Sequence, residues 1–224
     1  SAWHKATDMF GPIPYKEAGK GLITVPYDSQ EDVYKAMFEE LTAAIDVLTR
    51  YADNGTTLLL PKADAVYGGD VHKWVVYANS LMLSLAMRVY YADQDLSKKY
   101  AMQAINHPYG VMRAKADEAK MDRGAGLVFQ NNLDVLINQY NECRMGSSML
   151  ADLGGFQDPR LEKYFTTSTR PQAGSVDAMG NYLAVPTGHD VSSNNTFKGA
   201  SRPAITTATP TYWMRASEVY FLLA

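Results

Sequence analysis

The chain carries a cluster of aromatic, amide and guanidinium side chains near its middle. Asn138, Tyr140, Asn141 and Arg144 lie close together in the sequence, and Trp3 is a further aromatic residue near the first residue. An aromatic ring can stack on the apolar face of a sugar, while Asn and Arg side chains hydrogen-bond to its hydroxyl groups. We therefore predict that these five residues contact a ligand, although structural packing is the commoner role for any one of them.

Signatures of metal-dependent and nucleophilic catalysis are missing from the sequence. None of the four histidines has another at helical spacing, and Cys143 is the single cysteine, which argues against a transition-metal site or an internal disulfide. No Gly-x-Ser-x-Gly motif is present. Arg144 could activate the adjacent thiol, but an inert Cys143 is favoured. We predict neither a metal nor a cofactor.

Carboxylates are numerous enough to leave one catalytic alternative open. The 24 acidic residues include many pairs of the kind that hydrolyse glycosides, and the sequence alone selects none of them. The 224 residues are 46% hydrophobic and 20% charged, which indicates a folded chain with a core. A net charge of -3 gives no basic excess for nucleic-acid binding.

Helical periodicity indicates the elements that would position these side chains. We expect a first helix capped by Asp28, with Glu31 completing a capping box, that ends at Asn54-Gly55. A second helix should begin after Asp70 and run to about Tyr91. Its residues are apolar almost all round, so it should be central and buried.

The remainder of the chain has weaker signals. A third helix is expected over Leu96 to Ile105, and a short one over Ala114 to Met121. Ser147-Ser148 should cap a further short helix through Leu153, and Asp158 should cap another that has Pro159 in its first turn. Residues 166–209 are rich in Ser, Thr, Gly, Asn and Pro, which indicates a long irregular segment with a short strand near Tyr182 to Val185.

The end segments carry expectations of their own. The first residues contain no apolar stretch typical of a signal peptide. The last helix, Tyr212 to Ala224, is apolar and ends without a cap, so we expect the chain to be a fragment. The apolar stretch Trp74 to Ala92 is interrupted by polar residues, including Asn79 and Arg88, so we expect a buried helix rather than a membrane span.

Several short segments, in order along the chain, resemble one protein family. They are the F-G-P-I-P-Y segment with its preceding Asp8, the P-Y-D-S-Q-E-D-V-Y segment at 26–34, the segment at 69–88, D-P-R-L at 158–161, and 217–224. Together they resemble the SusD/RagB family of outer-membrane glycan-binding lipoproteins of Bacteroidetes. Ser84 departs from the family pattern, which often has arginine there, and this suggests a local change in packing.

The resemblance implies an architecture. It implies a mainly α fold, in which a scaffold of tetratricopeptide-like helix pairs carries long irregular loops. Residues 1–224 would be a fragment of a single SusD-like domain. The helical scaffold would cover about 28–110 and 210–224, and a loop-rich region on the ligand side would cover about 111–209.

The resemblance also implies a function and partners. The protein would bind oligosaccharide or polysaccharide at the extracellular face of the outer membrane, held there by a lipid anchor on an N-terminal cysteine, which we expect to lie outside this fragment. It would deliver the glycan to a TonB-dependent, SusC-like outer-membrane barrel. No catalytic residues are implied, so we do not expect an enzyme. Glycan-contacting residues differ between family members, so none is transferred to this sequence.

Two other functions stay open. A polysaccharide-degrading enzyme would need a carboxylate pair in a cleft. A helical scaffold that binds only protein would show no exposed aromatic surface for a sugar to stack on.

Overall fold

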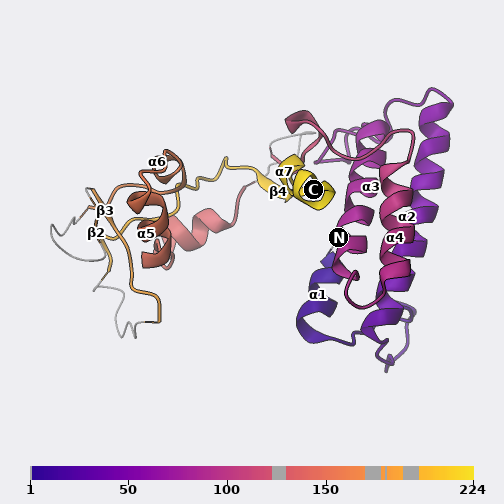
Figure 1. Cartoon of the computed structure of the whole chain (residues 1–224), viewed down its shortest axis with the longest axis horizontal. Coiled ribbons are helices and arrows are strands. Elements are labelled where there is room, and N and C mark those ends of the chain that lie inside the picture. Colours follow the sequence, from indigo (N-terminus) through magenta and orange to yellow (C-terminus); the bar gives the residue numbers. More distant parts are fainter. Residues whose placement is uncertain (1, 123–129, 170–177, 180, 189–196) are drawn as a thin grey trace. The chain divides into compact units, whose positions relative to one another are not determined.

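The computed structural model describes residues 2–122, 130–169, 178–179, 181–188 and 197–224 (Figure 1). The chain divides into two compact units. Unit 1 comprises Ser1–Leu127 and Thr211–Ala224, and unit 2 comprises Val128–Pro210. The prediction that residues 1–224 are a fragment of one domain stays a prediction, and each unit is described by itself.

Unit 1 is built from helices that surround α3. Its helices are α1 (Ala2–Phe10), α2 (Gln30–Asp53), α3 (Val71–Arg88), α4 (Gln94–Ile105) and α7 (Ala216–Leu223). The long helices α2, α3 and α4 lie side by side (Figure 1), and α3 contacts α2, α4 and α7. Thirteen of the 18 residues of α3 are buried, which confirms the prediction of a central helix.

Capping residues explain where the helices begin. Asp70 accepts a hydrogen bond from the Lys73 backbone N–H (3.0 Å), as predicted. The cap predicted for the first helix is wrong, because Ser29 rather than Asp28 accepts from the Asp32 N–H (3.1 Å). Asp28 instead accepts from the backbone N–H groups of Tyr15 (3.0 Å) and Lys16 (2.8 Å), and so closes the loop before α2.

Other predicted boundaries also need correction. Strand β1 (Ala119–Met121), which follows the helical turn η1 (Lys115–Asp117), pairs antiparallel with β4 (Thr211–Met214). The helices predicted over 114–121 and from Tyr212 were therefore wrong at these positions. The pairing joins segments far apart in the sequence, which local periodicity cannot show. Helix α3 ends at Arg88 rather than near Tyr91, and α1 was not predicted.

The core of unit 1 contains a buried polar residue, Ser80, whose hydrogen bonds are satisfied. Phe38 stacks on Tyr100 with ring centroids 4.1 Å apart. The Ser80 hydroxyl donates to the Val76 carbonyl (2.7 Å) and accepts from the Met112 N–H (2.8 Å). This is why α3 can carry polar side chains and remain buried. Within the described residues, no helix is both long and apolar enough to cross a membrane.

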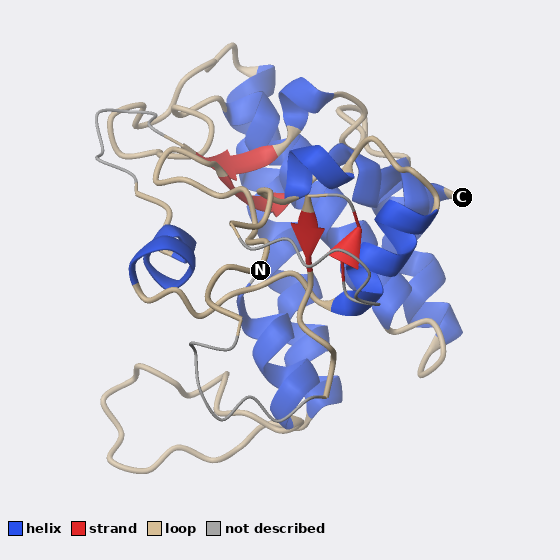
Figure 2. Cartoon of the chain, turned by 90° about the vertical axis from the view of Figure 1, so that its left-hand side faces the viewer, coloured by secondary structure: helices blue, strands red, loops and turns tan. Residues whose placement is uncertain are grey.

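Unit 2 has shorter elements and a smaller core. It contains the helical turn η3 (Val135–Gln139), helices α5 (Ser147–Gly155) and α6 (Leu161–Tyr164), and the antiparallel strands β2 (Ala178–Met179) and β3 (Tyr182–Leu183). Met145, Leu150 and Ala184 form a buried cluster. The strand predicted from Tyr182 is present, though short. Helices predominate over strands in the described residues (Figure 2), so the predicted mainly α fold is confirmed.

The predicted helix caps of unit 2 need correction. Gly146 rather than a serine is the N-cap of α5, and Arg160 is the N-cap of α6. Asp158 hydrogen-bonds to the backbone N–H and guanidinium of Arg160 instead. The carboxylate favours this partner because its charge is paired there.

Candidate functional site

The predicted ligand-binding residues fall into two sets. Asn138, Tyr140, Asn141 and Arg144 belong to unit 2, whereas Trp3 belongs to unit 1. The two sets are therefore described separately, and the hypothesis that all five contact one ligand stays a prediction.

A surface pocket of about 350 Å³ lies in unit 2. Its lining residues come from two segments on either side of α5 and a third near residue 197: Asn141, Glu142, Arg144, Gly146, Val185, Pro186, Thr187 and Phe197. Asn141 and Arg144 were predicted. Tyr140 precedes the pocket in the chain and is 62% exposed, so its ring is open to a ligand.

The turn after η3 brings Asn141 and Glu142 to the pocket. The Tyr140 backbone N–H donates to the Val135 carbonyl (2.8 Å), and the Glu142 N–H donates to the Leu136 carbonyl (3.0 Å). Asn141 adopts a left-handed conformation with φ of 61°. Asn tolerates this conformation better than most residues, so the chain can turn sharply at the edge of the pocket.

Arg144 holds one wall of the pocket in place. Its guanidinium donates to the backbone carbonyls of Phe197 (3.0 Å), Lys198 (3.3 Å) and Cys143 (2.8 Å). Burial, together with the nearby charge of Arg202, lowers the pKa of Arg144 below its usual value. Its bonds to the 197–198 segment indicate that Arg144 is mainly a positioning residue, although it also lines the pocket.

Asn138 supports the turn rather than lining the pocket. Its amide nitrogen donates to the Asp134 carboxylate (2.7 Å) and to the Ile205 carbonyl (3.0 Å). Both amide hydrogens are therefore used within unit 2. Asn138 ties η3 to the segment near Ile205.

Sequence reasoning missed two polar residues of the pocket, Glu142 and Thr187. Glu142 was identifiable by its position between Asn141 and Arg144. Thr187 had no such signal, because backbone bonds from Ser147 to Val185 (2.9 Å) and from Val185 to Met145 (2.8 Å) bring its segment to the site.

In unit 1, Trp3 lies at the start of α1 and is 49% exposed. Its ring is perpendicular to that of Tyr15, with centroids 5.8 Å apart. The Tyr15 hydroxyl donates to the Glu40 carboxylate (2.7 Å). The three side chains therefore form a contiguous corner between α1, the loop that follows it, and α2.

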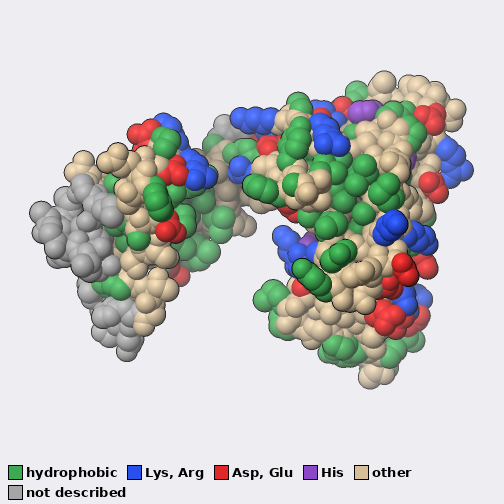
Figure 3. Space-filling view, viewed as in Figure 1, with side chains coloured by type: hydrophobic (Ala, Val, Ile, Leu, Met, Phe, Trp, Pro, Cys, Tyr) green, Lys and Arg blue, Asp and Glu red, His purple; other side chains and the backbone are tan. Residues whose placement is uncertain are grey.

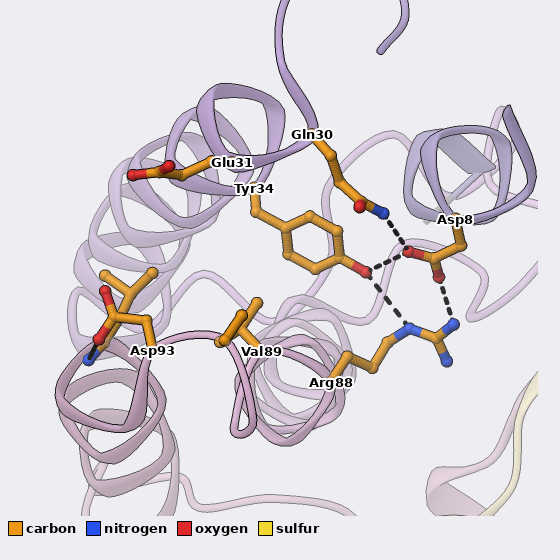
Figure 4. A pocket seen from close by; sticks show the side chains of 9 residues that line it. Asp8, Gln30, Glu31, Tyr34, Arg88, Val89 and Asp93 are labelled. Atoms are coloured by element: carbon orange, nitrogen blue, oxygen red, sulfur yellow. Dashed lines mark hydrogen bonds and ion pairs between the residues drawn. The ribbon is translucent and has the colours of Figure 1, made fainter. Parts of the chain in front are cut away.

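A second group in unit 1, the clasp, consists of Asp8, Gln30, Tyr34 and Arg88 (Figure 4). The Asp8 carboxylate accepts from the Tyr34 hydroxyl (2.7 Å) and the Gln30 amide (3.2 Å), and it pairs with Arg88. Burial and the bond to Asp8 raise the pKa of Tyr34 to about 12, so its hydroxyl stays protonated. The clasp borders a cavity of about 540 Å³ and joins α1, α2 and α3.

The clasp residues come from segments 8–15, 26–34 and 69–88, the segments on which the resemblance to SusD/RagB proteins rests. The family model described as "SusD-like: Susd and RagB outer membrane lipoprotein" matches residues 1–224. The chain belongs to the SusD-like family.

Solved structures of family members agree with this assignment of the SusD-like chain. BT1043 is 37% identical, with a TM-score of 0.85 over 99% of this chain and 43% of that one. A chitin-binding SusD homologue from Flavobacterium johnsoniae is 34% identical, with a TM-score of 0.86, and the match covers 98% of this chain and 44% of that one. A SusD homologue from Bacteroides uniformis is also 34% identical, with a TM-score of 0.82, and the match covers 99% of this chain and 44% of that one.

The SusD-like chain thus spans less than half the length of these structures. No curated protein matches it. The family resemblance predicted from the sequence is confirmed, and its description as a family of outer-membrane lipoproteins is the one we expected. Within the described part of the chain, no group of three or more His, Cys, Asp or Glu side chains is placed to hold a metal ion.

Proposed function

We propose that this SusD-like protein binds carbohydrate at the extracellular face of the outer membrane, through the pocket of unit 2. The observation that carries the proposal is a pocket with amide, carboxylate and hydroxyl groups, one of whose lining residues, Asn141, directly follows the exposed Tyr140 in the chain. The tyrosine ring can stack on the apolar face of a sugar, and Asn141, Glu142 and Thr187 can bond its hydroxyls. Arg144 positions the wall formed by residues 197–198.

The chemistry of the pocket favours a neutral, hydroxyl-rich ligand. Glu142 is an acceptor for hydroxyl groups, Asn141 offers both donors and an acceptor, and Thr187 offers a hydroxyl. Val185, Pro186 and Phe197 add apolar surface to the same pocket. Its volume of about 350 Å³ is near the lower limit for ligand sites, which suits one or two sugar units of a longer glycan.

The wider role in uptake rests on the family. A lipid anchor would hold the protein at the cell surface, and a TonB-dependent, SusC-like barrel would receive the glycan. Two similar structures are chitin-binding proteins, which supports the carbohydrate class and makes chitin the first polymer to test. We propose capture and delivery without catalysis.

Affinity electrophoresis of the purified protein in gels that contain glycol chitin, or plant, host or other microbial polysaccharides, tests this proposal. We expect retardation by at least one polymer. Tyr140→Ala should weaken binding about tenfold, because loss of ring stacking costs about 1.4 kcal/mol. Asn141→Gly should weaken it by a smaller factor, because glycine keeps the positive φ and only the amide is lost.

Tyr164→Ala is the matched control for Tyr140→Ala. Tyr164 is a 48% exposed tyrosine on α6 and, unlike Tyr140, has no pocket-lining residue next to it in the chain. Equal retardation of the Tyr140 and Tyr164 variants would reject the site. Release of reducing sugars from the retarding polymer would favour the enzyme, and no retardation by any polymer would favour the scaffold that binds only protein.

A further inference from the structure

Unit 1 has a second small pocket, of about 270 Å³, between α1, α2 and α3. Its lining residues are Trp3, His4, Tyr15, Met37, Glu40, Leu41, Ala44, Leu81 and Leu85. We infer that this pocket is an additional carbohydrate subsite, which holds a single sugar ring on unit 1. The inference rests on the proposed carbohydrate-binding function, but it uses residues that the unit 2 pocket does not contain.

An aromatic corner forms one side of this pocket. Trp3 and Tyr15 meet edge to face at 90°, with their ring centroids 5.8 Å apart. About half of Trp3 remains exposed, although it lies beside an apolar pocket that could bury it. An indole held by a neighbouring ring and open to solvent can stack on the C–H face of a sugar with little loss of conformational entropy.

The floor of the pocket is apolar and rigid. Met37 lies on α2, and Leu81 and Leu85 lie on α3; all three are buried in the core of unit 1. The floor therefore belongs to two packed helices rather than to a loop. The volume is smaller than that of a typical small-molecule site, so one ring fits better than a longer chain.

Glu40 provides an oriented acceptor at the edge of the pocket. The Tyr15 hydroxyl donates to Glu40 Oε2 (2.7 Å), and burial next to Glu40 raises the pKa of Tyr15, so this hydroxyl stays protonated. The bond fixes the carboxylate and leaves lone pairs for a sugar hydroxyl.

The charges of the residues that line the pocket favour a neutral ligand over an anion. Burial, with the nearby charge of Arg88, lowers the pKa of His4, so its imidazole is neutral at pH 7. Among the described residues that line the pocket, Glu40 is then the only charged one, and it would repel an anion. The apolar floor and the aromatic corner match the C–H face of a neutral sugar, and the carboxylate acceptor matches its hydroxyl groups.

Isothermal titration calorimetry with chitohexaose as the probe, on the whole chain, tests the subsite. We expect Trp3→Ala to weaken affinity about tenfold, Glu40→Gln about threefold, and Trp3→Phe less than Trp3→Ala because a ring remains. Trp213→Ala is the matched control, because Trp213 is 42% exposed, lies on β4 of the same unit, and is outside the pocket. It should bind as wild type does.

A second readout follows the indole directly. Addition of N-acetylglucosamine should change tryptophan fluorescence in the wild-type protein and in Trp213→Phe, and the change should be lost in Trp3→Phe. Retained helical circular dichroism in Trp3→Phe would show that the loss is not due to unfolding of α1.

The variants separate this inference from the proposed function. Weaker binding by Tyr140→Ala with unchanged binding by Trp3→Ala and Glu40→Gln would overturn the unit 1 subsite and leave the proposed function in place. The reverse pattern would support the subsite and reject the unit 2 pocket. If no polymer or oligomer binds, the fluorescence experiment decides. The subsite is then overturned if N-acetylglucosamine causes no fluorescence change, or if the change is the same without Trp3.

Discussion

The two units of this SusD-like protein reach stable structure in different ways. In unit 1, long amphipathic helices bury a large core, and Figure 3 shows polar and charged side chains at its surface beside exposed hydrophobic ones. In unit 2, the buried cluster of Met145, Leu150 and Ala184 is small, and backbone bonds and the Arg144 side chain hold the segments together. Periodic sequence therefore produces the helical scaffold, whereas the irregular sequence of unit 2 forms its pocket largely from loop segments.

The chain contains natural probes that follow each unit separately. Its three tryptophans, Trp3, Trp74 and Trp213, all belong to unit 1. Its single cysteine, Cys143, belongs to unit 2 and is half-buried. Tryptophan fluorescence thus reports the unfolding of unit 1, and the reactivity of the thiol reports the opening of unit 2.

The largest expected difference between the units comes from one substitution made in each core. Leu83 in α3 and Leu150 in α5 are both almost completely buried. We expect Leu83→Ala to lower the free energy of unfolding by about 4–5 kcal/mol, since the packed helices cannot collapse into the cavity, and Leu150→Ala by about 2–3 kcal/mol. Urea unfolding followed by fluorescence and by thiol reactivity measures both, and equal losses would contradict the comparison.

Two glycines allow the backbone packing of the two units to be compared. Gly69 in unit 1 and Gly188 in unit 2 both have positive φ, at 85° and 78°. A Cβ on Gly69 would lie 2.5 Å from the Leu59 carbonyl oxygen, whereas no atom of the described residues lies within 4 Å of one on Gly188. Gly69→Ala should cost about 3 kcal/mol, from strain plus a backbone clash, and Gly188→Ala about 1 kcal/mol from strain alone.

Denaturant midpoints of the two glycine variants test this difference. A Gly69→Ala protein as stable as Gly188→Ala would show that the loop before α3 shifts freely, contrary to its bonds to Asp64.

The smallest expected effect is a difference in acid sensitivity. Burial lowers the pKa of both His4 and His107 in unit 1. Because the unfolded chain then binds more protons, the free energy of unfolding of unit 1 should fall as the pH drops below about 6.5, by at most about 1.4 kcal/mol per pH unit for each histidine. Fluorescence-detected urea midpoints at pH 7.5 and 5.5 measure this fall, and His4→Gln should reduce it.

Unit 2 should respond at lower pH. Hydrogen bonds from Arg160 lower the pKa of Asp158 to about 2. This depressed pKa contributes stability that is present above about pH 4 and is lost as the pH falls toward 2. Thiol reactivity of Cys143 should therefore stay constant between pH 7.5 and 5.5, after correction for thiolate content. An increase in thiol reactivity in that range would contradict the expected difference in acid sensitivity between the two units.

Part of the candidate site could be found from the sequence. Asn141 and Arg144 were chosen because polar and aromatic residues cluster there, and both line the pocket. The same criterion selected Asn138, whose amide is instead bonded within unit 2. Residue type predicts which groups can bind a ligand, but it does not show which of them the fold has already paired.

The sequence by itself determined helices α2, α3 and α4, because apolar spacing, capping residues and turn residues act within a few positions of one another. It also determined the family, through short segments in a fixed order. Only the tertiary structure decided the β1–β4 pair, the clasp between α1 and α3, and the place of Thr187 beside Asn141. Each of these depends on hydrogen bonds or ion pairs between segments far apart in the sequence, so local sequence patterns do not specify them.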